Sequence, residues 1–263
     1  MRRFLCLLAG AFVFATTTAV SAQPSPGLDA LLSAGGAKTN APEDVGLVRQ
    51  TVLSESALVL GARAGLADRA REIIAILESR QVELDRRFSF GRLVLAQGVL
   101  PPVISESRDV VALDIVSMRV AGIIYKIDEP ARFAMPTPTW RDWLLIGLDA
   151  AAPAAAAPIG ELGPKTAAER VFWESRLRAS YSDGREQAQQ VFDSNFARLE
   201  RTYEGMRKFF ELVDRGMVTS PVIVSASDVV SREDPSTIAV GSTVFRITAG
   251  ADFTPAAAWK PLE

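Results

Sequence analysis

The chain's only cysteine, Cys6, lies in an N-terminal segment with the pattern of a secretory signal. A basic start, a short apolar run and a stretch of small side chains follow one another at Met1–Arg3, Phe4–Val13 and Ala19–Ala22. The apolar run is short for a membrane span, although an uncleaved anchor is the alternative. We expect cleavage after Ala22. The mature chain would then contain no thiol and no disulfide, so packing or partners must hold its fold.

The chain also contains no histidine. Histidine is the usual general base near neutral pH and the commonest metal ligand. Its absence, with that of a thiol, excludes Ser-His and Cys-His nucleophiles and ordinary zinc sites. The net charge of −2 comes without a basic run, so we expect no direct nucleic-acid binding. Chemistry carried by two carboxylates, such as glycoside hydrolysis, stays open.

The spacing of apolar residues changes twice in the first half of the chain. Residues 23–44 are rich in Pro, Gly, Ala and Ser, which predicts a flexible tether with a small leucine cluster outside the core. From Val48 to Phe88, apolar residues recur at three- and four-residue steps, which predicts a helix. Val110–Ile127 is the best strand candidate. Its apolar side switches at Gly122, which predicts either a bulge or a strand buried on both faces.

The second half begins with a predicted surface loop over Ala150–Pro164, rich in Ala and Pro. A helix is predicted from Thr166 to Tyr181, and residues 182–184 are expected to interrupt it. A further helix is predicted to about Arg215, where Gly216 stops it.

Two short β-rich runs follow at Val218–Ser227 and Ile238–Thr248. Pro221 confines the first to a sheet edge or to the start of a strand. Together, the predicted helices and strands indicate an α+β fold with helices flanking a small antiparallel sheet. We expect a signal peptide at 1–22, a flexible linker at 23–47 and a single domain at 48–263.

Several acids could serve as a general acid and base, although none lies in a recognisable motif: Asp109, Asp114, Glu161, Glu169 and Glu174. Solvated helix or turn faces explain them better. The spacing of a calcium loop is missing, and no glycine-rich phosphate loop follows a strand. We therefore expect no catalytic residues, no metal site, no cofactor and no small-molecule ligand.

Two tryptophans flank a charged pair in the sequence Trp140-Arg141-Asp142-Trp143. In a helical turn, residues three apart share one face. Buried, the indoles would be core anchors. Exposed, they would form a partner interface, because Trp and Arg are enriched at binding hot spots. The core alternative is favoured, since large aromatic residues are mostly buried.

Several stretches in order resemble the DotC family of type IVB (Dot/Icm-type) secretion systems, which includes a counterpart in IncI-type conjugation systems. These stretches are Leu100–Glu106, Tyr125–Ile127, Thr139–Leu144, Trp173, Gly184, Gln187-Ala188, Arg198-Leu199, Tyr203, Gly205-Met206, Gly216–Val218, Pro221, Gly241 and Phe245–Thr248.

The resemblance implies a structural subunit of the outer-membrane core complex, beside a DotD-like lipoprotein and a DotH-like channel-forming protein. Such a subunit supports export of protein or DNA–protein substrates and carries no catalytic residues. Family members usually have a lipid-bearing cysteine directly after the signal, whereas Ala22 is followed here by Gln23. We therefore expect a periplasmic protein attached to the outer membrane through its partners. The alternatives are a periplasmic carboxylate-dependent hydrolase acting on glycans and a periplasmic binding module with an enclosed pocket.

Overall fold

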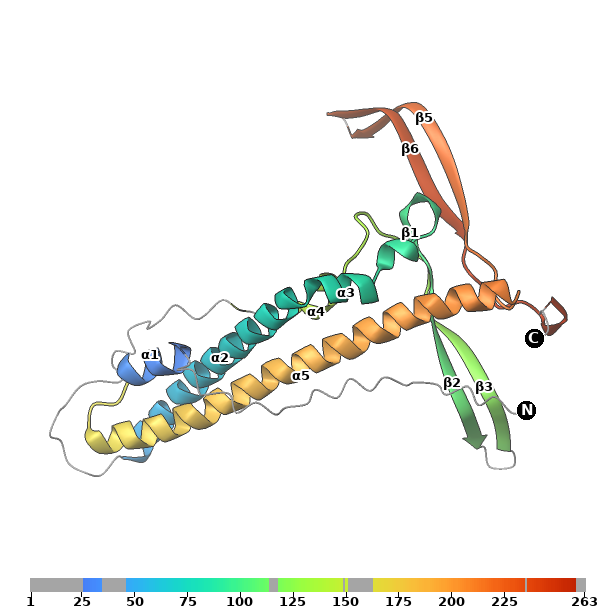
Figure 1. The fold of residues 1–263 in the computed structure, drawn as a ribbon. Coiled ribbons are helices and arrows are strands. Elements are labelled where there is room, and N and C mark those ends of the chain that lie inside the picture. Colours follow the sequence, from blue (N-terminus) through green and yellow to red (C-terminus); the bar gives the residue numbers. More distant parts are fainter. Residues whose placement is uncertain are drawn as a thin grey trace.

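The computed structural model describes residues 26–34, 46–113, 118–148, 150, 163–234 and 236–258. Figure 1 shows a rod of long helices with two β-hairpins projecting in opposite directions near one end. The expected signal peptide with Cys6 and the cut after Ala22 lies outside the described residues. So do Asp114, Glu161 and most of the loop predicted over Ala150–Pro164.

Two long helices form the rod, α2 (Leu47–Ser79) and α5 (Ala167–Asp214), and the short helix α3 (Gln81–Arg87) continues α2. The helices run side by side in the same direction (Figure 1). Their ion pairs follow this parallel order, from Arg49–Glu169 at one end to Arg87–Glu200 near the other. The helix predicted over Val48–Phe88 is confirmed, apart from the junction between α2 and α3.

The predicted interruption of the second helix at residues 182–184 is wrong, because α5 is continuous over 48 residues. Gly184 serves close packing instead of a turn. A Cβ atom there would lie well inside contact distance of the Ala62 carbonyl oxygen on α2. On the other side, Gly61 and Gly65 of α2 approach the α5 backbone just as closely. Small residues on both helices therefore let the two backbones touch.

Both ends of α5 follow from local sequence. The hydroxyl oxygen of Thr166 accepts a hydrogen bond from the backbone N–H of Glu169 at 3.1 Å, which caps the first turn. After Arg215, Gly216 adopts a φ of 69°, the left-handed conformation that commonly ends a helix. The stop predicted at Gly216 is confirmed.

The linker predicted over residues 23–47 contains a helix, α1 (Pro26–Ala34). Its Leu31 is buried with Leu53 of α2 and Trp173 of α5. The expectation that the leucine cluster stays outside the core is therefore wrong. Three leucines at helical spacing supply enough apolar surface to dock this short helix on the rod.

The strand predicted over Val110–Ile127 is two strands, β2 (Val103–Leu113) and β3 (Met118–Glu129), paired antiparallel. The register shift of this hairpin lies between Val103 and Ile104, so the bulge expected at Gly122 is wrong. The alternative of a strand buried on both faces is also wrong, because Ile123 and Ile124 are exposed. The switch at Gly122 falls within β3, whereas the chain returns between Leu113 and Met118.

The second hairpin pairs β5 (Val222–Asp234) with β6 (Thr237–Ala249), also antiparallel. Both predicted strands are confirmed, and Pro221 directly precedes the start of β5 as expected. A short pair, β1 (Val99–Leu100) and β4 (Arg132–Phe133), lies at the base of the first hairpin. The α+β class is confirmed, with the antiparallel strands divided among three two-stranded sheets.

Short helices complete the described chain: α4 (Arg141–Leu144) and 3₁₀ turns at Phe90–Arg92, Ala96–Gly98 and Ala256–Ala258. The largest core cluster lies where the end of α2 and α4 meet the middle of α5. In it Phe90 stacks on Trp143, with ring centroids 4.6 Å apart, and meets Tyr203 edge-on. Aromatic packing therefore fixes the junction from which the first hairpin leaves the rod.

Candidate functional site

The structure places Trp140 and Trp143 in the core, where they are 1% and 5% exposed. The Trp140 indole N–H donates to an Asp85 carboxylate oxygen at 2.7 Å, which satisfies its polar edge. Trp143 lies on the first turn of helix α4. Of the two alternatives for this motif, the burial of both indoles supports the core.

Arg141 and Asp142 lie nearer the surface than the two indoles. The guanidinium of Arg141 lies 4.2 Å from the centroid of the Trp140 ring. Asp142 accepts a hydrogen bond from the Thr139 backbone N–H at 2.6 Å, which ties the first turn of α4 to the segment before it. Both charged residues therefore have a local structural role. Their predicted contact with a partner stays a prediction.

The acids considered as general acid and base are held by arginines instead. Glu169 accepts from Arg49 at 3.1 Å across the two helices, and this arginine keeps the pKa of Glu169 below its usual value. Glu174 pairs with Arg170 on the preceding turn of the same helix. The side chain of Asp109 lies outside the part of the chain that the structure describes. Among the described residues, no group of three or more acidic, Cys or His side chains converges as a metal site would.

A second set of polar contacts crosses the rod at its glycine-rich contact. The buried carboxylate of Asp68 accepts from the Tyr181 hydroxyl at 2.8 Å and pairs with Arg71. One turn on, Glu72 binds Arg185 at 2.7 Å, and this bond lowers the pKa of Glu72. These bonds fix the register of α2 against α5. They offer no unpaired acid for catalysis.

A groove of about 710 Å³ runs between α2–α3 and α5. Its floor is apolar and aromatic, and its rim carries charges of both signs. The lining includes Arg69, Ile73, Leu77, Arg80, Leu84, Arg87, Phe88, Arg185, Phe192 and Phe196. Three rim arginines are engaged within the chain, because Arg69 and Arg185 both bind Glu72 and Arg87 binds Glu200.

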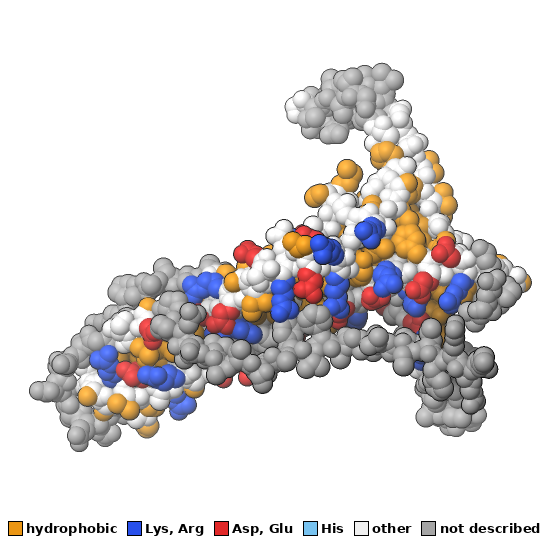
Figure 2. All heavy atoms as spheres, viewed as in Figure 1, with side chains coloured by type: hydrophobic (Ala, Val, Ile, Leu, Met, Phe, Trp, Pro, Cys, Tyr) orange, Lys and Arg blue, Asp and Glu red, His pale blue; other side chains and the backbone are white. Residues whose placement is uncertain are grey.

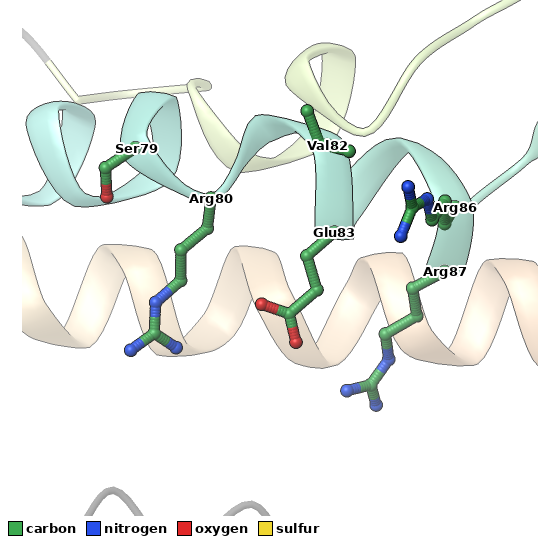
Figure 3. A pocket seen from close by; sticks show the side chains of 6 residues that line it. All are labelled: Ser79, Arg80, Val82, Glu83, Arg86 and Arg87. Atoms are coloured by element: carbon green, nitrogen blue, oxygen red, sulfur yellow. The ribbon is translucent and has the colours of Figure 1, made fainter.

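A shallower hollow of about 560 Å³ lies over the junction of α2 and α3. Figure 3 shows Arg80, Glu83 and Arg87 projecting from the same side of this junction, with the carboxylate between the two guanidinium groups. Val82 and Arg86 point elsewhere. The hollow is therefore a surface of alternating charge on a helix turn.

Both hairpins carry exposed apolar side chains. We call β2–β3 arm 1 and β5–β6 arm 2. Figure 2 shows apolar side chains along arm 2 and charges of both signs along the rod. Ile123 and Ile124 of arm 1 are exposed, as are the following residues of arm 2: Val222, Val224, Val244 and Phe245. Each arm has only two strands, so each offers two unpaired strand edges.

Arm 1 is tied to the rod at its base. Glu106 of β2 binds Lys208 of α5 at 3.1 Å, and it also binds Arg108. These two cations, Arg108 foremost, lower the pKa of Glu106. Ile104 packs on Phe209 in a small apolar cluster. Sequence patterns missed the arms as a site because a hairpin's exposed apolar face resembles a core face until the fold is known.

The comparisons with known proteins give one positive result. A family model described as "Type IV secretory system, conjugal DNA-protein transfer" matches residues 47–261. No curated protein matches the chain. Within the described residues, none of the helices has both the length and the apolarity that a membrane span requires. Because the match covers most of the sequence, the chain belongs to this TraI family of the type IV secretory system, which is described by conjugal DNA-protein transfer.

Proposed function

We propose that this chain is a structural subunit of the outer-membrane core complex of a type IVB secretion or conjugation system. In that role it supports export of protein or DNA–protein substrates and performs no catalysis. The observation that carries the proposal is the pair of exposed arms on a rigid rod (Figure 1).

The arms favour assembly with other proteins because of how little supports them. An isolated two-stranded hairpin is marginally stable in water, and three or more strands or a packed helix are needed for independent stability. The described parts of both arms carry exposed apolar residues, including Ile124 and Val224. Such surfaces on an otherwise charged molecule are typical of protein contacts. In the proposed complex, partner chains cover them.

The rod suits a stiff support for the two arms. At 1.5 Å per residue, a helix as long as α5 extends about 70 Å. The close glycine contacts and interhelical ion pairs make α2 and α5 one stiff element. A stiff rod with both arms near one end holds them at a fixed separation, as a ring-shaped assembly requires.

We propose DotD-like and DotH-like core proteins as the partners, following the resemblance of the arm and junction residues to the DotC family. The protein would reside in the periplasm and reach the outer membrane through these partners, without its own lipid. It would contact neither nucleic acid nor a small-molecule ligand directly.

The test is affinity purification of the tagged chain from gently solubilised envelopes, with co-purifying proteins identified by mass spectrometry. We expect DotD-like and DotH-like proteins in the outer-membrane fraction. Ile124→Asp on arm 1 should reduce their recovery, whereas Val171→Asp should not, because Val171 is an exposed residue of the rod remote from the arms. A chain recovered alone and soluble would contradict the proposal.

A further inference from the structure

Two segments of this chain have closely similar sequences. Residues 90–111 and 209–230 correspond at a constant offset, and the same residue stands at ten of the 22 positions. Unrelated segments of that length share about one or two at ordinary amino-acid frequencies. The identical pairs are Phe90/Phe209, Leu93/Leu212, Val94/Val213, Val99/Val218, Pro102/Pro221, Val103/Val222, Ile104/Ile223, Asp109/Asp228, Val110/Val229 and Val111/Val230.

The two arms also have the same strand register. In arm 1 the register shifts between Val103 and Ile104, and Ile104 then pairs with Ile127. In arm 2 the shift falls between Val222 and Ile223, and Ile223 pairs with Ile247. These are corresponding positions of the two segments. The bases of the two arms are therefore equivalent in register.

The connections below the arms match as well. Val99 pairs with Phe133 below arm 1, and Val218 forms a bridge with Phe253 below arm 2. The backbone N–H of Ala134 donates to the Gly98 oxygen at 2.9 Å, and that of Thr254 donates to the Met217 oxygen at 2.9 Å.

The turn that leads into each arm is also shared. Gln97 has a φ of 57° and its counterpart Gly216 a φ of 69°. Gln97 is thus held in a conformation that usually requires glycine, at the position where the second copy has glycine. The two segments are therefore copies of one unit, which leads through a left-handed turn into a hairpin.

The two copies differ in what covers the base of the hairpin. In arm 1, Ile104 is 2% exposed and packs against Phe209 and Leu212 of α5, with Tyr125 and Ile127 beside it. Val103 lies directly over Gly205 of the same helix. The base of arm 1 is therefore a helix-binding face, and α5 occupies it.

The corresponding face of arm 2 consists of Ile223, Phe245 and Ile247, which share one side of the β5–β6 ribbon. In the described part of the chain, α5 packs on β2 but makes no comparable packing with β5. Phe245 is 42% exposed. Val222 is 51% exposed, against 7% for its counterpart Val103. The second copy thus presents the same face without the helix.

We propose that this face of arm 2 binds an apolar helix of a partner protein, in the way that the base of arm 1 binds α5. The chemistry of that helix follows from the occupied copy. It presents a small residue, an aromatic residue four positions on and a leucine three positions later, as Gly205, Phe209 and Leu212 do. Ser225 stands in arm 2 where Glu106 stands in arm 1, so no lysine is required.

The test adds a synthetic helix to the purified full-length chain. The probe is a peptide of residues 198–215, stapled between positions 207 and 211, which are exposed in α5 and lie opposite Gly205 and Phe209. The staple offsets the low helicity of a short isolated peptide. Fluorescence anisotropy of the labelled peptide measures binding to the chain and to two variants, Phe245→Glu and Val244→Glu. Val244 is a similarly exposed neighbour on the opposite side of the ribbon.

We expect saturable binding that Phe245→Glu weakens at least tenfold and Val244→Glu leaves within about twofold. A peptide carrying Phe209→Glu should fail to bind the unaltered chain. Absence of binding, or equal loss with both chain variants, would overturn the proposal. Self-association of the chain that Phe245→Glu abolishes would also overturn it, because the occupant would then be a second copy. The assay contains only the chain and the peptide, so its failure leaves the proposed secretion role standing.

Discussion

The rod and the arms of this protein are stabilised in opposite ways. In the rod, helices α2 and α5 meet through glycines so closely that no side chain fits between them, and interhelical ion pairs fix their register. In the arms, two strands bind only each other over most of their length and leave apolar residues exposed. The rod is complete within one chain. We propose that another chain completes the arms.

This difference assigns stability and binding to separate parts of the sequence. A change in the rod should cost folding free energy, whereas a change at an exposed arm position should cost binding and leave the fold intact.

The strongest test of the core at the junction is Trp140→Ala. The change removes a buried indole and leaves Asp85 without its donor, so we expect a loss of about 3 to 5 kcal/mol in the free energy of unfolding. Urea denaturation followed by circular dichroism measures it. Phe245→Ala on arm 2 is the matched aromatic control. A similar loss from both would mean that arm 2 is packed as tightly as the core.

Gly184→Ala tests the close approach of the two rod helices. The added methyl group meets the Ala62 backbone, which cannot move aside as a side chain would. We expect a destabilisation of about 1 to 3 kcal/mol by urea denaturation, although alanine favours an isolated helix. Gly91→Ala, where a Cβ meets nothing within 4 Å, is the control and should be nearly neutral. A stabilised Gly184→Ala protein would show that the helices do not touch there.

The interhelical ion pairs predict a loss of stability in acid. Arg49 depresses the pKa of Glu169 and Arg185 that of Glu72, so each carboxylate binds its proton more weakly in the folded chain. Their contribution is present above about pH 4.3, the usual pKa of glutamate, and is lost as the pH falls through the lowered values. Melting temperatures measured from pH 7 down to pH 3 should decrease accordingly.

Glu169→Gln tests how much of this pH dependence comes from the ion pair at one end of the rod. We expect a loss of about 1 kcal/mol at pH 7, because the charge-assisted bond to Arg49 becomes an ordinary one. The variant should then lose less stability than the unaltered chain between pH 7 and pH 3. An unchanged pH profile would show that this pair does not hold the helices.

The smallest effect on folding is expected from Ile124→Asp in arm 1. The residue is 41% exposed, so the free energy of unfolding should change by less than about 0.5 kcal/mol. Recovery of partners from envelopes should nevertheless fall severalfold. Unfolding of the whole chain by this variant would remove the distinction between rod and arms.

The helices, the strands and the α+β class follow from sequence periodicity, but three features do not. Gly184 resembles a helix break because the contact that requires glycine lies on α2, at Ala62, more than a hundred residues earlier. The return of the chain within Val110–Ile127 was hidden because both strands carry β-branched residues and only the pairing separates them. Leu31 was assigned to a tether because its partners, Leu53 and Trp173, are distant in sequence.

The candidate site was the least predictable part. The Trp140–Trp143 motif stood out by residue type, yet its two indoles are core anchors. The arms contain ordinary strand residues, and their exposure depends on the absence of a third strand. The sequence did hold one usable signal. Pro-Val-Ile occurs at Pro102 and again at Pro221, and Asp-Val-Val occurs at Asp109 and again at Asp228. These shared tripeptides mark the arms as two copies of one element.

Hydrogen exchange followed by mass spectrometry tests the division into rod and arms most directly. The purified chain and the same chain in its envelope complex would be compared peptide by peptide. We predict slow exchange along α2 and α5 in both samples, and fast exchange in arm 2 and in arm 1 beyond its base on α5 that slows markedly in the complex. Arms that exchange equally fast in both samples, with new protection confined to the rod, would contradict the account.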